Sequence, residues 1–343
     1  MTSAPDLAAP ARGTAMPAEA ARLAASYDPE RLLAELDAAR TRTWEKQRVY
    51  SESGVGAATD VDWRCLALRS PGGDGTRTDP GGPGPRDFAP TEWLDGMPYV
   101  REVLDSIPAP LHAVRFMALG TDTVGIDHTD PKYGPRWGVA RLHVPVTTNP
   151  KALLVLDGVT HRWQPGEFWF GDFSRVHHVE NTGPEPRVHL VIDALVTPGL
   201  ARVFPAGWQE YFECGEVLYN RPSCGQRAEE RARLECSFEI PASFPLWEED
   251  GTLDDDQPWT EVTVRDDGTQ LVLHQGDRAT GQPYALVHID ANEYRLAGWS
   301  EERTLQLFLD GMQPHAVLRI REGRTVTERS VPAVPGARNG NGR

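Results

Sequence analysis

The feature that most constrains the fold is a series of short apolar segments between residues 113 and 195, without intervening helices. Five segments have the alternation or the apolar content of β-strands: 113–119, 140–147, 152–156, 167–170 and 187–195. Turn signals at Asp157-Gly158 and Pro165-Gly166 separate some of them. Short strands at this spacing indicate an antiparallel barrel or sandwich, so we predict a mainly β core from about 98 to 199.

Helices are expected to flank this core. Asp28 can cap a helix whose first turn contains Pro29 and which extends to about Gln47, and a second helix is expected to begin at Pro98. We predict one domain over 28–199, preceded by a disordered Ala- and Pro-rich segment, 1–27. Residues 71–90 are so rich in glycine and proline that we expect a mobile loop, either a lid beside a site or a surface insertion.

The C-terminal part is expected to form a separate unit. Residues 200–257 are a connecting segment, with a helical pattern at 226–235 and an acidic stretch at 248–257. Residues 258–332 are predicted to form a small α+β unit, with a helix from Ser300 to about Leu309 and strands at 260–265, 270–274, 284–289, 315–320 and 325–331. Residues 333–343 are expected to be disordered.

Charge and composition narrow the classes of partner. The formal charge of −15 argues against binding of nucleic acid or an anionic membrane, because either would need clustered lysine and arginine. No signal peptide or transmembrane pattern is evident, so a soluble, cytoplasmic protein is expected. The four cysteines, at 65, 214, 224 and 236, include no C-x-x-C pair, and a chain of this length does not need disulfides, so they are interpreted as reduced thiols. The spacing of the last three fits no common zinc finger.

A cluster of histidines indicates a metal site. Six of the ten histidines lie between residues 128 and 189. His128 and Asp130 are two residues apart, so on a strand both side chains point to the same side, and His177 or His178 could add a third ligand. Two histidines and one carboxylate on one face of an octahedron leave three positions open, as in non-haem iron(II) oxygenases. Zinc is a weaker candidate, because it prefers four tetrahedral ligands.

Arg187 is a candidate for binding a dicarboxylate beside this metal. It begins the segment Arg187-Val188-His189-Leu190-Val191-Ile192-Asp193, in which Val188, Leu190 and Ile192 share one face. If that face packs outward, Arg187 and His189 face the mouth of the barrel, where a guanidinium can bind a carboxylate through two hydrogen bonds. The alternative is a surface salt bridge.

Several separated motifs, taken in order, resemble the aspartyl/asparaginyl β-hydroxylase family, which includes bacterial proline hydroxylases among the iron(II)/2-oxoglutarate dioxygenases. The resemblance covers roughly residues 44–196 and is strongest over 114–193. It implies a double-stranded β-helix (jelly-roll, cupin-like) core. The motifs are Val114-Arg115-Phe116-Met117, His128-Thr129-Asp130, Arg141-Leu142-His143, Trp163-Gln164-Pro165-Gly166-Glu167, His177-His178-Val179-Glu180-Asn181 and the strand that begins at Arg187.

Residue by residue, the resemblance implies iron(II) bound by His128, Asp130 and His177. It also implies that Arg187 pairs with the distal carboxylate of 2-oxoglutarate and that Arg141 and His143 help to hold this co-substrate. His177 is preferred to its neighbour because the family pattern reads His-x-Val-x-Asn. The carboxylate at position 130 places the chain nearer the bacterial amino-acid hydroxylases than the animal peptide hydroxylases, which lack it, and disfavours halogenation.

The sequence therefore predicts a dioxygenase that hydroxylates an unactivated C–H bond of an amino acid, free, peptide-embedded or carrier-tethered, and releases succinate and carbon dioxide. Charged residues near the motifs that could bind the substrate are not ranked: Arg115, Arg136, Arg162, Asp122 and Asp127. The C-terminal unit would serve a larger substrate or a homodimer. Two alternatives are a non-catalytic, cupin-like metal-binding protein and a metal hydrolase on the same barrel.

Overall fold

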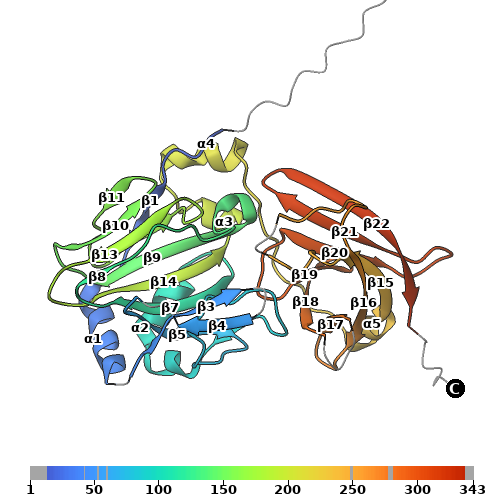
Figure 1. Ribbon diagram of the computed structural model, residues 1–343, viewed down its shortest axis with the longest axis horizontal. Helices are drawn as coiled ribbons and strands as arrows, with labels where there is room; N and C mark the ends of the chain where they lie inside the picture. Colours follow the sequence, from blue (N-terminus) through green and yellow to red (C-terminus); the bar gives the residue numbers. More distant parts are fainter. Residues whose placement is uncertain are drawn as a thin grey trace, which may run out of the picture.

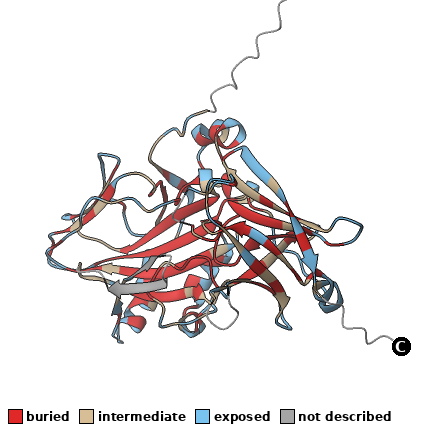
Figure 2. Ribbon diagram, turned by 45° about the vertical axis from the view of Figure 1, so that its right-hand side comes forward, coloured by how far each residue is buried: buried red, intermediate tan, exposed pale blue. Residues whose placement is uncertain are grey.

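The computed structural model describes residues 14–41, 43–51, 54–58, 61–247, 250–276 and 281–336. These residues form two β-rich domains that lie side by side (Figure 1), joined by a segment with α3 (Pro198–Ala201) and α4 (Ala206–Cys214). Buried residues run through the sheets of both domains (Figure 2). No helix of the described part is long and apolar enough to cross a membrane.

The first domain is built around two antiparallel sheets. The larger follows the order β1-β12-β9-β14-β7-β5-β2, with β6 beside β5, and the smaller the order β11-β10-β13-β8. The larger sheet consists of β1 (Ala20–Ser26), β2 (Glu45–Lys46), β5 (Trp63–Pro71), β6 (Phe88–Pro90), β7 (Leu111–Leu119), β9 (Val139–Thr147), β12 (Glu167–Gly171) and β14 (Arg187–Leu195). The smaller consists of β8 (Thr123–Val124), β10 (Ala152–Leu156), β11 (Val159–His161) and β13 (His177–Asn181), and β3 (Arg48–Ser51) pairs with β4 (Gly54–Ala58) separately. The predicted jelly-roll core is confirmed.

Helices cover the outer face of the larger sheet and so decide which strand face looks inward. The covering helices are α1 (Pro29–Arg40), α2 (Pro98–Asp105) and the 3-10 turn η1 (Glu92–Gly96), whereas the 3-10 turn η2 (Pro135–Trp137) precedes β9. The side chain of Asp28 caps α1 by accepting the backbone N–H of Glu30 at 2.9 Å. Leu32 and Leu36 of α1 belong to one apolar core with Leu190 of β14. The alternate residues of β14 are therefore directed to the other side of the sheet.

Two predictions about the N-terminal part are wrong. The segment 1–27 was expected to be disordered, but β1 pairs with β12 at the edge of the large sheet, and its Ala21 and Leu23 are buried. Residues 1–13 lie outside the described part. The first helix ends at Arg40 rather than at about Gln47, because the chain turns there and the indole of Trp44 donates to the carbonyl of Ala39 before β2 begins.

The second domain is a closed antiparallel barrel of eight strands. Its strands are β15 (Cys236–Pro241), β16 (Trp259–Asp266), β17 (Leu271–Gln275), β18 (Pro283–Asp290), β19 (Glu293–Leu296), β20 (Arg303–Phe308), β21 (His315–Glu322) and β22 (Thr325–Pro335). Apolar side chains fill its interior. The helical turns α5 (Ala228–Arg231) and η3 (Ala232–Leu234) precede the first strand, where the sequence predicted a single helix over 226–235.

The boundaries and one element of this domain differ from the prediction. The barrel begins at β15, within the expected connecting segment, and β22 extends to Pro335, into the expected disordered tail. Residues 337–343 of that tail lie outside the described part. The helix expected from Ser300 is wrong, because β20 occupies this region and Leu305 and Leu307 both point into the core of the barrel. Ser300 Oγ accepts a hydrogen bond from the backbone N–H of Glu302, as the cap of a helix would. The same hydroxyl donates to the backbone carbonyl of Trp137 in the first domain at 2.6 Å, and no helix follows.

Residues 71–90, which the sequence predicted to be a mobile loop, join the two domains. Backbone hydrogen bonds link Gly84 to Ala297 at 3.1 Å and to Ala285 at 2.8 Å, both in the barrel. Asp87 forms a 2.7 Å ion pair with Arg295. Apart from the short strand β6 at its end, this Gly- and Pro-rich segment has no regular structure, but these contacts fix it in place.

Candidate metal centre and substrate cavity

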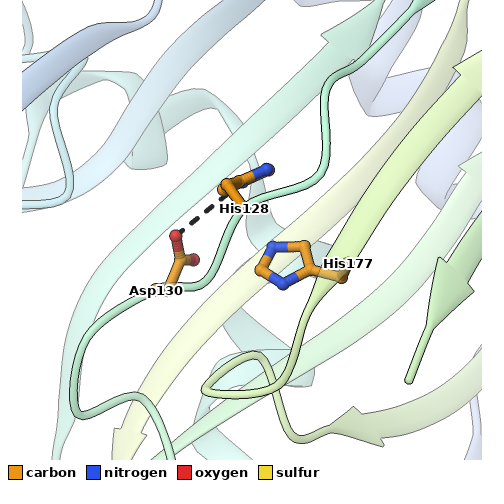
Figure 3. A group of neighbouring side chains, drawn as sticks. All are labelled: His128, Asp130 and His177. Atoms are coloured by element: carbon orange, nitrogen blue, oxygen red, sulfur yellow. Dashed lines mark ion pairs between the residues drawn. The ribbon is translucent and has the colours of Figure 1, made fainter.

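Three side chains of the first domain converge on one point (Figure 3). One ligand atom each from His128, Asp130 and His177 lies within 4.8 Å of the other two, and no other such group of histidine, cysteine or acidic residues occurs among the described residues. His177 begins β13, and an isolated β-bridge pairs it with His128. Asp130 lies beyond the bridge, where its N–H donates to the carbonyl of Phe173 at 2.9 Å. The predicted trio is therefore close together, although His128 and Asp130 lie on a bridge and a turn rather than on a regular strand.

Hydrogen bonds to the backbone orient both histidines as metal ligands. The Nδ1 atom of His128 lies 2.9 Å from the carbonyl of Ile126, and Nδ1 of His177 lies 2.8 Å from the carbonyl of Arg175. A carbonyl can only accept, so Nδ1 carries the proton in each ring and Nε2 is left with a free lone pair. Nε2 of His128 lies 3.9 Å from Oδ1 of Asp130. Two imidazole nitrogens and one carboxylate oxygen thus face the same point.

The protonation states also fit metal binding. Burial lowers the pKa of His177 below its ordinary value, against the opposing effect of Asp130, and so keeps the ring neutral. Although burial opposes ionisation of Asp130, the charge of Arg141 lowers the pKa of this carboxyl group. A neutral imidazole and an ionised carboxylate are the forms that bind a divalent ion. The donor set therefore suits iron(II) without any rearrangement of protons.

Arg141 connects this trio to a second buried carboxylate. Its guanidinium contacts Asp130 and is anchored by Asp193 through Nε at 2.7 Å and Nη2 at 3.2 Å. It also lies over the ring of Tyr133, at 4.0 Å from the centroid. Burial opposes the charge on Arg141, but Asp193 and Asp130 raise the pKa of the guanidinium above its ordinary value. The resemblance implied that Arg141 holds the co-substrate, but here it is already paired with two carboxylates.

The trio opens into a cavity of about 570 Å³ that the two sheets enclose and that Arg187 and His143 help to line. Arg187 is 6% exposed and pairs with no carboxylate of the described residues; its Nε donates to His189 at 2.9 Å. Burial alone lowers the pKa of Arg187 to about 10. The alternative of a surface salt bridge is therefore wrong, and the buried cation lacks an anionic partner.

Two neutral histidines lie between Arg187 and the metal trio. Nδ1 of His143 lies 3.2 Å from Nδ1 of His189, and Nε2 of His143 is buried without a hydrogen-bond partner. Burial, followed by the charge of Arg187, lowers the pKa of both rings well below the ordinary value. An unpaired donor or acceptor on a cavity wall is costly unless a ligand satisfies it.

Arg115 is a second buried cation in this cavity. Its side chain is 2% exposed, Nη2 is 3.5 Å from Asp193, and Nε and Nη1 have no hydrogen-bond partner. The sequence named Arg115 among several unranked candidates and overlooked Asp193. Alternation along the strands could have found both, because Asp193 shares a face of β14 with Arg187, and Arg115 shares a face of β7 with the cavity residue Met117.

The other candidates lie outside the cavity lining. His178 contacts Asp127 at 2.6 Å and Glu180 at 3.3 Å, which leaves His177 as the ligand of this pair. Arg136 pairs with Glu322 of the barrel at 2.8 Å. Asp122 and Arg162 are exposed. The C-terminal part supplies a lining residue that the sequence did not indicate, the buried Trp247.

A jelly-roll with two histidines, one aspartate and open space at their common point defines the class of non-haem metal oxygenases. Residues 28–196, about half of the chain, match the family model described as Aspartyl/Asparaginyl beta-hydroxylase. The first domain therefore belongs to this family, as the motifs indicated. Membership makes the protein an oxygenase that uses iron(II) and 2-oxoglutarate, and the three side chains described above fit that metal.

Comparison with curated proteins gives no match. Among solved structures, an oxidoreductase of the 2OG-Fe(II) oxygenase family from Burkholderia pseudomallei aligns with 11% identity and a TM-score of 0.32, over 47% of this chain and 77% of that one. A predicted oxalate decarboxylase from Thermotoga maritima aligns with 17% identity and a TM-score of 0.21, over 28% and 74% of the two chains. The family assignment does not depend on these distant likenesses.

Proposed function

We propose that this protein hydroxylates an amino acid that presents a free carboxylate, either as a single molecule or as the end of a peptide. The observation that supports this most strongly is the pair of buried guanidinium groups, Arg187 and Arg115, that lack full partners in one cavity. Each is suited to one carboxylate, the first to the co-substrate and the second to the substrate.

The balance of charge supports an anionic substrate group. Apart from Arg48, which lines the cavity but is exposed, three guanidinium groups (Arg115, Arg141 and Arg187) and two carboxylates (Asp130 and Asp193) lie in or beside the cavity. They leave one positive charge when the histidines are neutral. A divalent metal ion and a doubly charged 2-oxoglutarate cancel each other. The remaining positive charge then matches one substrate carboxylate, because a buried charge is stable only with a partner.

In the proposed site, His128, Asp130 and His177 would hold iron(II), and Arg187 would bind the distal carboxylate of 2-oxoglutarate. Bound together with 2-oxoglutarate, the metal supplies the oxidising power to insert oxygen from dioxygen into an unactivated C–H bond, with succinate and carbon dioxide as co-products. Arg141 keeps Asp130 ionised and directed at the metal position, and Asp193 holds Arg141. His143, with its unpartnered Nε2, lies where it could hydrogen-bond the co-substrate.

The protein also has to direct the substrate and exclude water. Apolar side chains also line the cavity and offer space for a hydrocarbon side chain: Val61, Trp63, Met117, Leu154, Val191 and Trp247. Arg115 would fix the carboxylate end of the substrate, so that the carbon to be attacked is held at one distance from the metal. Apolar walls of this kind keep water from competing with the substrate.

A screen for succinate formation tests the proposal. Purified protein is supplied anaerobically with iron(II) and 2-oxoglutarate, then with dioxygen and one of a set of free amino acids, their amides or short peptides. We expect succinate only with compounds that keep a free carboxylate, and we expect Arg115→Met to remove that requirement along with most of the activity. Equal turnover of acids and amides would contradict the role of Arg115.

The same experiment separates the alternatives. A non-catalytic metal-binding protein would form no succinate with any compound and would tolerate loss of Arg187. A metal hydrolase would be indifferent to both 2-oxoglutarate and oxygen. The buried Arg187 favours the oxygenase, because neither alternative explains a guanidinium kept in a cavity at the expense of stability.

A further inference from the structure

The C-terminal barrel reaches the metal-bearing part of the first domain. Trp247, just after β15, lines the cavity, and its ring lies 4.9 Å from that of Trp299. Trp299 in turn contacts the edge of Tyr133, the residue that stacks on Arg141. A continuous set of side chains thus leads from the barrel to the residues around Asp130.

The segment that carries Asp130 has an unusual backbone. Tyr133 N–H donates to the carbonyl of Asp130 at 3.3 Å, with Pro131 in the second position and Lys132 in the third at φ 62°. This combination is typical of a type II turn, whose third position normally requires glycine or asparagine. Lys132 therefore holds a left-handed conformation that disfavours its side chain, and it is also only 5% exposed. The surrounding structure has to hold this turn in place.

Glu302 of the barrel provides that support. Its Oε1 lies 2.7 Å from Nζ of Lys132, and its Oε2 accepts the indole N–H of Trp299 at 2.7 Å. Glu302 is 3% exposed, so the ion pair is desolvated on both sides. A buried ammonium without its counter-charge would draw the lysine toward solvent, and the turn would move with it.

We propose that Glu302 is a positioning residue for the metal centre: through Lys132 it fixes the turn that aims Asp130 at the metal. This inference rests on the metal site of the proposed function and extends that site into the second domain. It gives the barrel, in which the sequence shows no catalytic motif, a role in the first domain. The two domains then act as one unit rather than as an enzyme with an attached module.

The test compares two neighbouring glutamates of the full-length protein. Glu302→Gln removes the counter-charge of Lys132. The control, Glu301→Gln, removes an equally buried carboxylate. Glu301 pairs with Arg221 at 2.6 Å, and neither residue lines the cavity. Binding of manganese(II) alone is measured by the loss of the free-ion electron paramagnetic resonance signal. This readout needs no turnover. We expect Glu302→Gln to weaken manganese(II) binding about tenfold, within the range for residues that orient metal ligands, and Glu301→Gln to leave it within about twofold.

A double variant separates positioning from stability. Lys132→Met combined with Glu302→Gln removes both buried charges, so the fold should recover stability relative to Glu302→Gln. Manganese(II) binding should nevertheless stay weak, because the ion pair that fixes Lys132 against the barrel is then absent. Unchanged binding in Glu302→Gln, equal weakening in Glu301→Gln, or recovery of binding with stability in the double variant would each overturn the proposal. Failure of the unaltered protein to bind manganese(II) would instead overturn the metal site itself.

Discussion

Replacement of Arg187 by methionine should make the protein more stable and at the same time prevent it from binding 2-oxoglutarate. Arg187 is buried and pairs with no carboxylate of the described residues, and burial lowers its pKa to about 10. At 1.36 kcal/mol for each pH unit, a depression of this size corresponds to roughly 3 kcal/mol against the folded state at neutral pH. The charge lowers the free energy of unfolding because the guanidinium is charged in both the folded and the unfolded protein, and only the folded protein buries it.

Methionine has a similar length and no charge, so it removes this cost while it keeps most of the packing. Loss of the hydrogen bond to His189 offsets about 1 kcal/mol of this stabilisation. The free energy of unfolding of Arg187→Met should therefore exceed that of the unaltered protein by roughly 2 kcal/mol. For a domain of this size, that gain should raise the melting temperature by about 4 to 8 °C. Binding of 2-oxoglutarate should weaken by at least about 100-fold, since a charge-assisted pair contributes about 3 kcal/mol.

Differential scanning calorimetry and calorimetric titration measure both effects. Arg162→Met is the matched control, because Arg162 is exposed and its loss changes the net charge equally. With manganese(II) present, 2-oxoglutarate should raise the melting temperature of the unaltered protein and of the control, but not that of Arg187→Met. A lower melting temperature for Arg187→Met together with intact binding of 2-oxoglutarate would show that Arg187 stabilises the fold and does not bind the co-substrate.

Three further predictions concern His177, Asp193 and Glu293. His177→Ala should weaken binding of manganese(II) by at least about 100-fold, whereas His178→Ala, beside it in the chain, should bind normally; the reverse result in a metal titration would reassign the ligand. Asp193→Asn should weaken the same binding by about 10- to 100-fold, because Asp193 holds Arg141 against Asp130, and unchanged binding would contradict that link. Although burial opposes ionisation of Glu293, hydrogen bonds from Arg221, Thr304 and Arg321 lower its pKa to about 2. The free energy of unfolding should therefore fall by up to about 3 kcal/mol as pH drops from about 4.5 to 2, and acid denaturation of Glu293→Gln should lack this component.

The strands of the first domain could be predicted because alternation and turn signals agree there. The bounds expected for 152–156 and 187–195 match β10 and β14, and the face of β14 that carries Arg187 was assigned correctly. Ordering the motifs along the chain then brought together His128, Asp130 and His177. Local patterns were sufficient where neighbouring strands impose a strict period, whereas His128 and Asp130, on a bridge and a turn, were found from the order of the motifs.

The second domain shows where local patterns fail. Ser300 and the two glutamates after it have the composition of a helix start, but Ser300 bonds to Trp137 and Glu302 to Lys132 across the domain interface. Similarly, residues 71–90 have the composition of a mobile loop, yet hydrogen bonds to the barrel hold them. Contacts between residues more than 150 positions apart decide these elements, and no short window of sequence contains them.

The most direct test of the metal centre is an anomalous scattering map from crystals grown anaerobically with iron(II) and 2-oxoglutarate. We expect one strong iron peak bonded to Nε2 of His128, a carboxylate oxygen of Asp130 and Nε2 of His177, with the distal carboxylate of 2-oxoglutarate on Arg187. Iron bound elsewhere, or 2-oxoglutarate that leaves Arg187 without a partner, would show that the site is assigned to the wrong residues.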